Sequence, residues 1–287
     1  MYYKAINYWV LGGFEGNKKP TQAIDDAKEM GLDGIELTFG DALKEDISET
    51  ECHEIRQYAE SKHIGLRTLA SGFYWSCSLA SPDVEEREKA LAFSEKYLRT
   101  AASLGIETIL LVPGAVDVAW DPSRPVLPYE EVWDNATESI RKLVPLAEEL
   151  EVNIGIENVW NKFLLSPMEM KIFIEQFSSR RIGVYFDVGN VLLNGYPDHW
   201  IRLLGNHIKA VHVKNFNRAD CGGVLHGFGE SLKDGDLDYQ KTKEALQAIN
   251  YDGPLTIEMI PFSRLPDLVL PDMELARKVA NEFKELL

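Results

Sequence analysis

Four short apolar segments in the second half of the chain each lead to one side chain that can bind a metal ion. These side chains are Glu157, Asp187, His212 and Glu258. Each one closes a run of β-favouring residues, and Gly, Asn or Pro soon follows. Carboxylate oxygens with one imidazole suit Mn²⁺, Mg²⁺ or Co²⁺ better than a structural zinc site, which prefers sulfur and nitrogen. The set predicts one divalent cation, with zinc as a further candidate, and hence a metal-dependent enzyme.

Two of these residues could also transfer protons. If Glu157 and Glu258 lie on opposite faces of a metal-chelated ketose, one can remove the proton next to the carbonyl. The metal would polarise that carbonyl and stabilise the enediolate, and the other glutamate would return a proton on the far face. The predicted chemistry is therefore epimerisation or isomerisation by general acid–base catalysis.

The segments that carry these residues belong to a series of alternating strand and helix signals. We expect strands at 5–10, 33–39, 64–69, 108–114, 153–158, 182–187, 208–214 and 254–259. We expect helices at 21–30, from 48, from 83, at 129–150, from 166, from 199, at 238–249 and at 272–287. Eight strands, each followed by a helix and with no composition break, predict an α/β fold with a single (β/α)8 TIM barrel over residues 1–287. A doubly wound sheet also alternates, but its Gly-rich phosphate loop after the first strand is absent.

In a TIM barrel the active site lies at the C-terminal ends of the strands. The four side chains would end the fifth to eighth strands, which are neighbours around half of the barrel, so their tips can converge on one ion. Two coordination positions would then be open to the vicinal oxygens of a sugar. A lone glutamate or histidine at a strand end is usually solvated or structural, but four at equivalent positions favour a metal site.

Composition limits the partners and the compartment. The chain has 287 residues, is 45% hydrophobic and carries a formal net charge of −16 at pH 7. Such an acidic surface repels phosphate backbones and anionic membranes, so neither nucleic acid nor a membrane is expected as a partner. No apolar run has the length of a membrane span, and the N-terminus lacks the pattern of a signal peptide. Cys52, Cys77 and Cys221 fit no zinc spacing, and reduced thiols in a cytoplasmic protein are expected.

Five phrases of the sequence carry a family resemblance. They are Asp33-Gly34-Ile35-Glu36-Leu37, Ile156-Glu157-Asn158, Phe186-Asp187-Val188-Gly189-Asn190, His212-Val213-Lys214-Asn215 and the stretch from Tyr251 to Glu258. With them, nearly the whole chain resembles the xylose isomerase-like sugar isomerases and epimerases. The resemblance implies that Glu157, Asp187, His212 and Glu258 hold the metal and that Glu157 and Glu258 form the acid–base pair. It also implies a small-molecule sugar or sugar phosphate as substrate, and a homodimer or homotetramer.

Further residues match substrate contacts within this family. Arg218 lies six residues after His212, where the ketose 3-epimerases place an arginine that holds the substrate. His226 lies in a loop that commonly borders the substrate, although an ordinary loop histidine is an equal reading. Glu36 on the second expected strand matches a residue typical of the family. A purely structural role for Glu36 is supported equally.

The sequence also departs from the family pattern. Where the family often has histidine three residues after the aspartate ligand, this chain has Asn190. The Asn-Arg-Phe-Glu stretch of ketose 3-epimerases corresponds here to residues 161–164, which end in Leu164 in place of the glutamate. This change argues against a free ketohexose. Lys162 could bind a substrate phosphate as a point charge, so we expect a phosphoketose in preference to a free ketose. The alternative is that Lys162 is an ordinary solvated lysine of a loop.

Aromatic residues gather in the segments expected at the mouth of the barrel, where sugar C–H faces can pack on their rings. Barrel rims and dimer interfaces use such residues as well. The set comprises Tyr8, Trp9, Phe14, Phe73, Tyr74, Trp75, Trp120 and Trp160.

Three other functions compete with an epimerase. An inosose-type dehydratase would use the same proton abstraction but expel a hydroxyl. An abasic-site endonuclease of the same fold needs many histidine ligands, whereas this chain has six histidines, four of them expected on helices or helix ends: His53, His63, His199 and His207. A non-catalytic sugar-binding barrel would not need the two acid–base glutamates.

Overall fold

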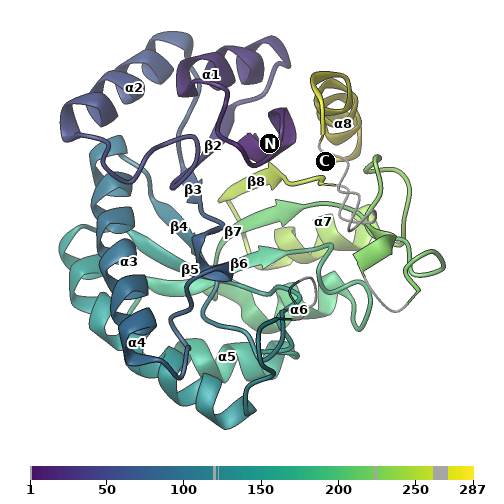
Figure 1. The fold of residues 1–287 in the computed structure, drawn as a ribbon. Helices are drawn as coiled ribbons and strands as arrows, with labels where there is room; N and C mark the ends of the chain where they lie inside the picture. The colour runs from purple at the N-terminus through teal and green to yellow at the C-terminus, as the bar shows by residue number, and fades with distance from the viewer. Residues whose placement is uncertain (1, 119–120, 122, 223–224, 261–270) are drawn as a thin grey trace.

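A computed structural model describes residues 2–118, 121, 123–222, 225–260 and 271–287. Their strands form one closed parallel barrel in sequence order from β1 to β8, with the long helices outside it (Figure 1). The strands are β1 (Tyr3–Asn7), β2 (Gly34–Thr38), β3 (Thr68–Ala70), β4 (Thr108–Leu111), β5 (Asn153–Glu157), β6 (Ile182–Asp187), β7 (Ile208–Val213) and β8 (Pro254–Ile257). The (β/α)8 TIM barrel predicted from the alternating pattern is confirmed.

A helix follows each strand, and specific capping residues mark the ends of some of these helices. The helices are α1 (Pro20–Glu29), α2 (Glu49–Lys62), α3 (Val84–Leu104), α4 (Tyr129–Glu149), α5 (Pro167–Glu175), α6 (Pro197–Leu204), α7 (Tyr239–Ala248) and α8 (Met273–Leu286). At the start of α2, Ser48 and Glu51 form the expected capping box. Gly105 ends α3 with φ of 74°, a left-handed conformation that glycine adopts without strain. The sixth helix begins at Pro197, two residues before the expected start at His199.

The first strand differs from its prediction in a way that affects the site. The expected strand over 5–10 stops at Asn7, because the Asn7 side chain accepts a hydrogen bond from the Trp9 backbone N–H and caps a 3-10 helix, η1 (Tyr8–Leu11). The β-favouring aromatic residues after Asn7 therefore belong to a tight turn. The third strand is also shorter than the expected 64–69 and shifted, occupying Thr68–Ala70.

The register of the last four strands directs the candidate ligands to one side of the sheet. Asp187 pairs with His212, Glu157 pairs with Tyr185, and His212 pairs with Thr256. Side chains of paired residues lie on the same face of the sheet, and along one strand every second side chain lies on that face. Glu258 lies two residues after Thr256, so all four ligands face the barrel interior.

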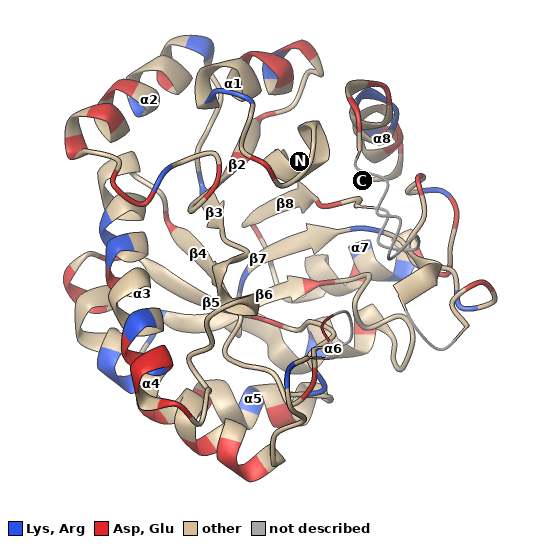
Figure 2. Cartoon of the chain, viewed as in Figure 1, with Lys and Arg blue, Asp and Glu red and all other residues tan. Residues whose placement is uncertain are grey.

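Charged residues are concentrated away from the barrel wall. Figure 2 shows acidic and basic residues mainly on the outer helices, whereas the strands carry few charged residues of either sign. Acids buried within the barrel are therefore exceptions that need a partner. Among the described residues, no helix is both long and apolar enough to cross a membrane.

Candidate active site

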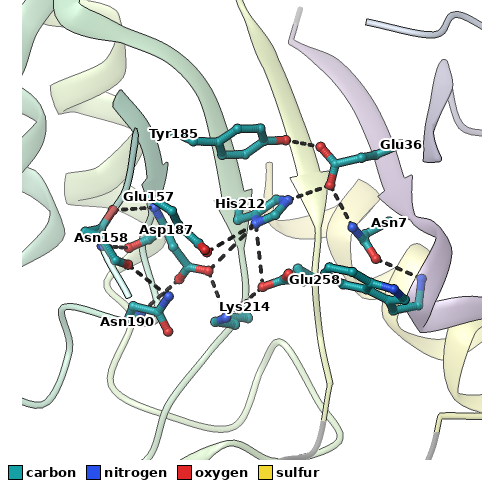
Figure 3. Close-up of polar contacts among 11 residues, drawn as sticks. Asn7, Glu36, Glu157, Asn158, Tyr185, Asp187, Asn190, His212, Lys214 and Glu258 are labelled. Carbon is teal, nitrogen blue, oxygen red and sulfur yellow. Dashed lines mark hydrogen bonds and ion pairs between the residues drawn. The ribbon is translucent and has the colours of Figure 1, made fainter. Parts of the chain in front are cut away.

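The four predicted ligands meet at the C-terminal end of the barrel. Glu157, Asp187, His212 and Glu258 are all buried, and one ligand atom from each lies within 4.8 Å of the others (Figure 3). They come from the ends of β5, β6, β7 and β8, as the sequence predicted. The convergence gives a compact donor set of three carboxylates and one imidazole.

The two ring nitrogens of His212 have separate surroundings. Nε2 lies 2.6 Å from Glu36 Oε1. Nδ1 faces the cluster, 3.5 Å from Glu258 Oε2 and 3.8 Å from Glu157 Oε1. No hydrogen-bond partner for Nδ1 exists within the described part of the chain. With Nε2 engaged by a carboxylate, Nδ1 is the nitrogen available to a metal.

Glu36 supports His212 from behind and does not belong to the four-ligand cluster. Its carboxylate accepts hydrogen bonds from Asn7 Nδ2 at 2.7 Å and from the Tyr185 hydroxyl, in addition to its contact with His212 (Figure 3). Burial raises the pKa of Glu36, but His212 and these hydrogen bonds outweigh burial and lower it overall. An ionised Glu36 holds the ring of His212 in one orientation. Of the two roles that the sequence left open for Glu36, this geometry favours the structural one.

Asp187 is fixed by two asparagines. Asn158 bridges the ends of two strands, because its Nδ2 donates to the Asp187 carbonyl at 2.8 Å and its Oδ1 accepts from the Asp187 N–H at 2.9 Å. The Asn190 backbone N–H donates to Asp187 Oδ1 at 2.8 Å, and Asn190 Nδ2 donates to the Asn158 carbonyl at 3.0 Å. The other carboxylate oxygen of Asp187 is thereby left facing the cluster.

Lys214 is a site residue that the sequence reasoning missed. Its Nζ lies 2.8 Å from Asp187 Oδ2 and 2.7 Å from Glu258 Oε2, and the side chain is buried. Burial lowers the pKa of this lysine, but the neighbouring carboxylates outweigh that effect and raise it well above its usual range. A Cβ on Gly189 would come within 2.4 Å of Lys214 Cγ, so the glycine makes room for the lysine. The missed signal was spacing, since Lys214 follows β7 two residues after His212, and side chains two residues apart in extended chain point to the same face.

The electrostatics of the cluster fit a divalent cation. Burial and the charges of Glu258 and Asp187 outweigh the contacts with His212 and raise the pKa of Glu157 to about 7. Burial also raises the pKa of Asp187, and Lys214 only partly offsets this. Burial lowers the pKa of His212, yet Glu258 and Glu36 raise it overall, which shows how strongly the cluster attracts positive charge. A divalent cation would supply that charge in place of protons.

A pocket of about 530 Å³ opens beside the cluster. Glu157, Glu258 and Lys214 line it, together with Asn190 and Trp160. Asp187 and His212 are fully buried and lie behind these residues. The two glutamates proposed for acid–base chemistry are thus the two ligands that also face the pocket.

Comparison with known proteins identifies the family. Residues 24–285 match the family model described as xylose isomerase-like TIM barrel. The chain belongs to this family. D-psicose 3-epimerase of Agrobacterium fabrum is 27% identical, over 96% of this chain and 89% of that protein. Inosose dehydratase of Geobacillus thermodenitrificans is 24% identical, over 69% of this chain and 71% of that protein.

One further protein is similar in sequence, and one solved structure is similar in fold. An uncharacterized protein of Methanocaldococcus jannaschii is 26% identical over 62% of this chain, and the match spans only 59% of that protein. The solved structure of an L-ribulose 3-epimerase superposes with a TM-score of 0.79 at 17% identity, covering 100% of this chain and 94% of that one. At this identity the superposition supports the shared xylose isomerase-like fold alone.

Three of the residues predicted to contact substrate lie outside the pocket lining of this xylose isomerase-like barrel. Arg218 donates to the carbonyls of Leu192 and Gly195. Lys162 has a side chain that is 66% exposed and pairs with Asp117. His226 is exposed. Their roles in substrate binding stay predictions, because loop side chains point where local hydrogen bonds direct them and sequence spacing does not encode this.

The aromatic residues predicted at the mouth divide into two groups. Trp9, Phe14, Phe73, Trp75 and Trp160 line the pocket. Tyr8 and Tyr74 are buried and are not part of the described lining, while Trp120 lies outside the described residues. The prediction of an aromatic mouth therefore holds for the residues that follow β1, β3 and β5.

Proposed function

We propose that this protein is a divalent-metal-dependent epimerase or isomerase that acts on a ketose or ketose phosphate. The observation that carries the proposal is the convergence of Glu157 and Glu258 on one cluster while both also line the pocket. The similarity to a D-psicose 3-epimerase over nearly the whole chain supports the same reaction class. Mn²⁺, Mg²⁺ and Co²⁺ are the proposed cofactors, since the donor set is rich in oxygen.

Each group at the site has a role in this reaction. A divalent cation held by Glu157, Asp187, His212 and Glu258 would polarise the ketose carbonyl when bound. One glutamate accepts the proton from the carbon next to the carbonyl, and the other donates a proton on the opposite face. Both glutamates line the pocket, so each can reach a ketose bound there. Asp187 and His212, buried behind the pocket, serve as ligands only.

An inosose-type dehydratase is the second candidate. Lys214 places an ammonium group in the pocket, where it could stabilise a departing hydroxyl after the same proton abstraction. Similarity to inosose dehydratase supports this alternative. The two reactions share their first step and differ in the fate of the neighbouring hydroxyl.

Incubation of the Mn²⁺-loaded protein with ketoses and ketose phosphates in D₂O tests the proposal. We expect deuterium at the carbon next to the carbonyl, formation of an epimer or isomer, and no loss of water, measured by NMR and mass spectrometry. Chelation of the metal should stop exchange. A product lighter by one water would contradict epimerisation and establish the dehydratase alternative.

A further inference from the structure

The pocket is larger than one sugar. At about 30 Å³ for each CHOH unit, close to the share of one water molecule in the liquid, a six-carbon sugar fills roughly 180 Å³. This is about a third of the 530 Å³ available. A single ketose at the acid cluster would therefore leave most of the pocket open to another part of the substrate.

The remaining space is bounded by aromatic rings on the opposite side of the barrel. In the closed order of eight strands, β1 lies across from β5 and β3 lies across from β7. Trp9 and Phe14 follow β1, and Phe73 and Trp75 follow β3. Glu157 ends β5 and Lys214 follows β7. The pocket thus reaches from the catalytic acids across the mouth to this aromatic wall, defined as Trp9, Phe14, Phe73 and Trp75.

Three rings of the aromatic wall, those of Trp9, Phe14 and Phe73, are held in place by contacts within the protein. Trp9 Nε1 donates to Asp41 Oδ2 at 2.7 Å, and the Trp9 and Phe14 ring centroids are 5.3 Å apart. Phe73 stacks on the buried Phe93, with centroids 3.7 Å apart and planes inclined by 4°. Fixed rings bind the apolar face of a sugar at a low cost in conformational entropy.

The polar groups of the pocket favour an uncharged ligand. Besides the two catalytic glutamates, Asp41 and Glu45 add negative charge to the lining. Among the described lining residues the single cation is Lys214, which is already paired with Asp187 and Glu258. A phosphate group would meet these like charges and, within the described lining, no cation other than the paired Lys214. Trp160 also lines the pocket, and its Nε1 is buried without a hydrogen-bond partner in the described part of the chain.

We infer that the pocket binds an uncharged two-ring substrate, with the reacting ketose at the acid cluster and a second sugar ring on the aromatic wall. This inference rests on the proposed function for the position of the ketose. It replaces the phosphoketose favoured by the sequence with a ketose that carries a glycosyl group. Lys162, the residue expected to meet a phosphate, lies outside the pocket lining and pairs with Asp117.

Three ligands that differ at one hydroxyl test this inference. The Mn²⁺-loaded protein is titrated with D-fructose, with D-fructose phosphorylated on its terminal hydroxyl, and with D-fructose carrying a glucosyl ring on that hydroxyl. Calorimetry gives Kd for each without requiring turnover. We expect the glucosyl compound to bind roughly tenfold more tightly than D-fructose, the upper range for an aromatic contact, and the phosphate to bind more weakly.

Variants of the aromatic wall then locate the second ring. Phe73→Leu and Trp75→Leu should each lower the ratio of the affinity for the glucosyl compound to the affinity for D-fructose. Tyr58→Leu, on α2 and outside the pocket, is the matched control and should leave this ratio unchanged. Glu45→Lys should strengthen binding of the phosphorylated ligand, because it reverses one charge of the lining.

Equal affinities for D-fructose and its glucosyl derivative, or tightest binding of the phosphate, would overturn the two-ring inference. Deuterium exchange into D-fructose under those conditions would still uphold the proposed function. Conversely, tight binding of the glucosyl compound without exchange in any ligand would uphold the pocket assignment and contradict the epimerase.

Discussion

At the scale of single residues, the site depends on how His212 is oriented. Its Nε2 contacts Glu36 at 2.6 Å, and this leaves Nδ1 turned toward the three carboxylates. Asn7 and Tyr185 in turn hold Glu36. A ligand whose ring is already oriented binds a metal with less loss of conformational freedom, so the supporting carboxylate should affect metal affinity without touching the metal.

Replacement of Glu36 tests whether its carboxylate orients the ring of His212. In Glu36→Gln the charge behind His212 is lost, and we expect the affinity for Mn²⁺ to fall by about 10- to 100-fold, the usual effect of removing a partner of a ligand. Calorimetric titration with Mn²⁺ measures the change. Glu88→Gln, an exposed change on α3, is the control and should bind Mn²⁺ like the wild type. Unchanged affinity in Glu36→Gln would show that the contact does not orient the ligand.

The titration of Glu157 gives a pH dependence to the stability of the metal-free protein. Burial and nearby acids raise its pKa from 4.5 to about 7 in the folded state. A raised carboxyl pKa means that the folded protein holds the proton more tightly, so stability is lost as pH rises through this window. In urea unfolding with a chelator present, the wild type should lose stability relative to Glu157→Gln as pH rises from about 4.5 to about 7. Parallel pH curves for the two proteins would contradict this.

The sequence revealed the four candidate ligands because each one closes a strand, but it did not reveal everything around them. Lys214 was not predicted as a site residue, although it lies two residues after His212 and alternation along the chain would have been enough to place it in the cluster. Arg218 is different, since its direction depends on hydrogen bonds to the carbonyls of Leu192 and Gly195. Those contacts arise only once a separate loop has folded against it.

At the scale of elements, the ends of β5 and β6 are joined by Asn158. Its side chain makes one hydrogen bond to each backbone polar group of Asp187. The register between the two strands is therefore fixed at the point where each supplies a ligand. Without these bonds the ends of β5 and β6 could move apart, and Glu157 would then be separated from Asp187.

Removal of this connection should affect stability and the metal site together. Asn158→Ala leaves a buried N–H and a buried carbonyl of Asp187 without partners, at a cost of about 2–4 kcal/mol. Chemical denaturation should show this loss, and the Mn²⁺ affinity should fall. Ser48→Ala removes a helix cap on α2 and should cost about 1 kcal/mol with Mn²⁺ affinity unchanged. An Asn158→Ala protein with wild-type stability would show that water or a neighbour replaces both bonds.

The boundaries of elements were predictable where a specific cap exists and less so where propensity alone was available. Ser48 and Gly105 mark helix ends that follow from their chemistry. The end of β1 was extended too far because Tyr8, Trp9 and Val10 are β-favouring residues. The Asn7 side chain decides the turn by a local hydrogen bond, and this contact competes with strand propensity.

At the scale of the whole molecule, closure of the barrel is what turns separate strand ends into a site. The alternation of strands and helices predicts the fold, because eight parallel strands with covering helices have few other arrangements. The size and charge of the pocket could not be predicted, since they depend on loops from opposite sides of the barrel. The aromatic wall after β1 and β3 faces the acids of β5 to β8 only in the closed structure.

The central claim is that Glu157 and Glu258 act on opposite faces of one ketose. Exchange of the carbon-bound proton in D₂O, followed by NMR for each of two epimers, tests it directly in Mn²⁺-loaded Glu157→Gln and Glu258→Gln. We expect both variants to bind substrate and to lose epimerisation by about 100-fold or more. Each should still exchange the proton of one epimer, and the two variants should exchange opposite epimers. Exchange of the same epimer by both variants, or undiminished epimerisation in either, would contradict the account.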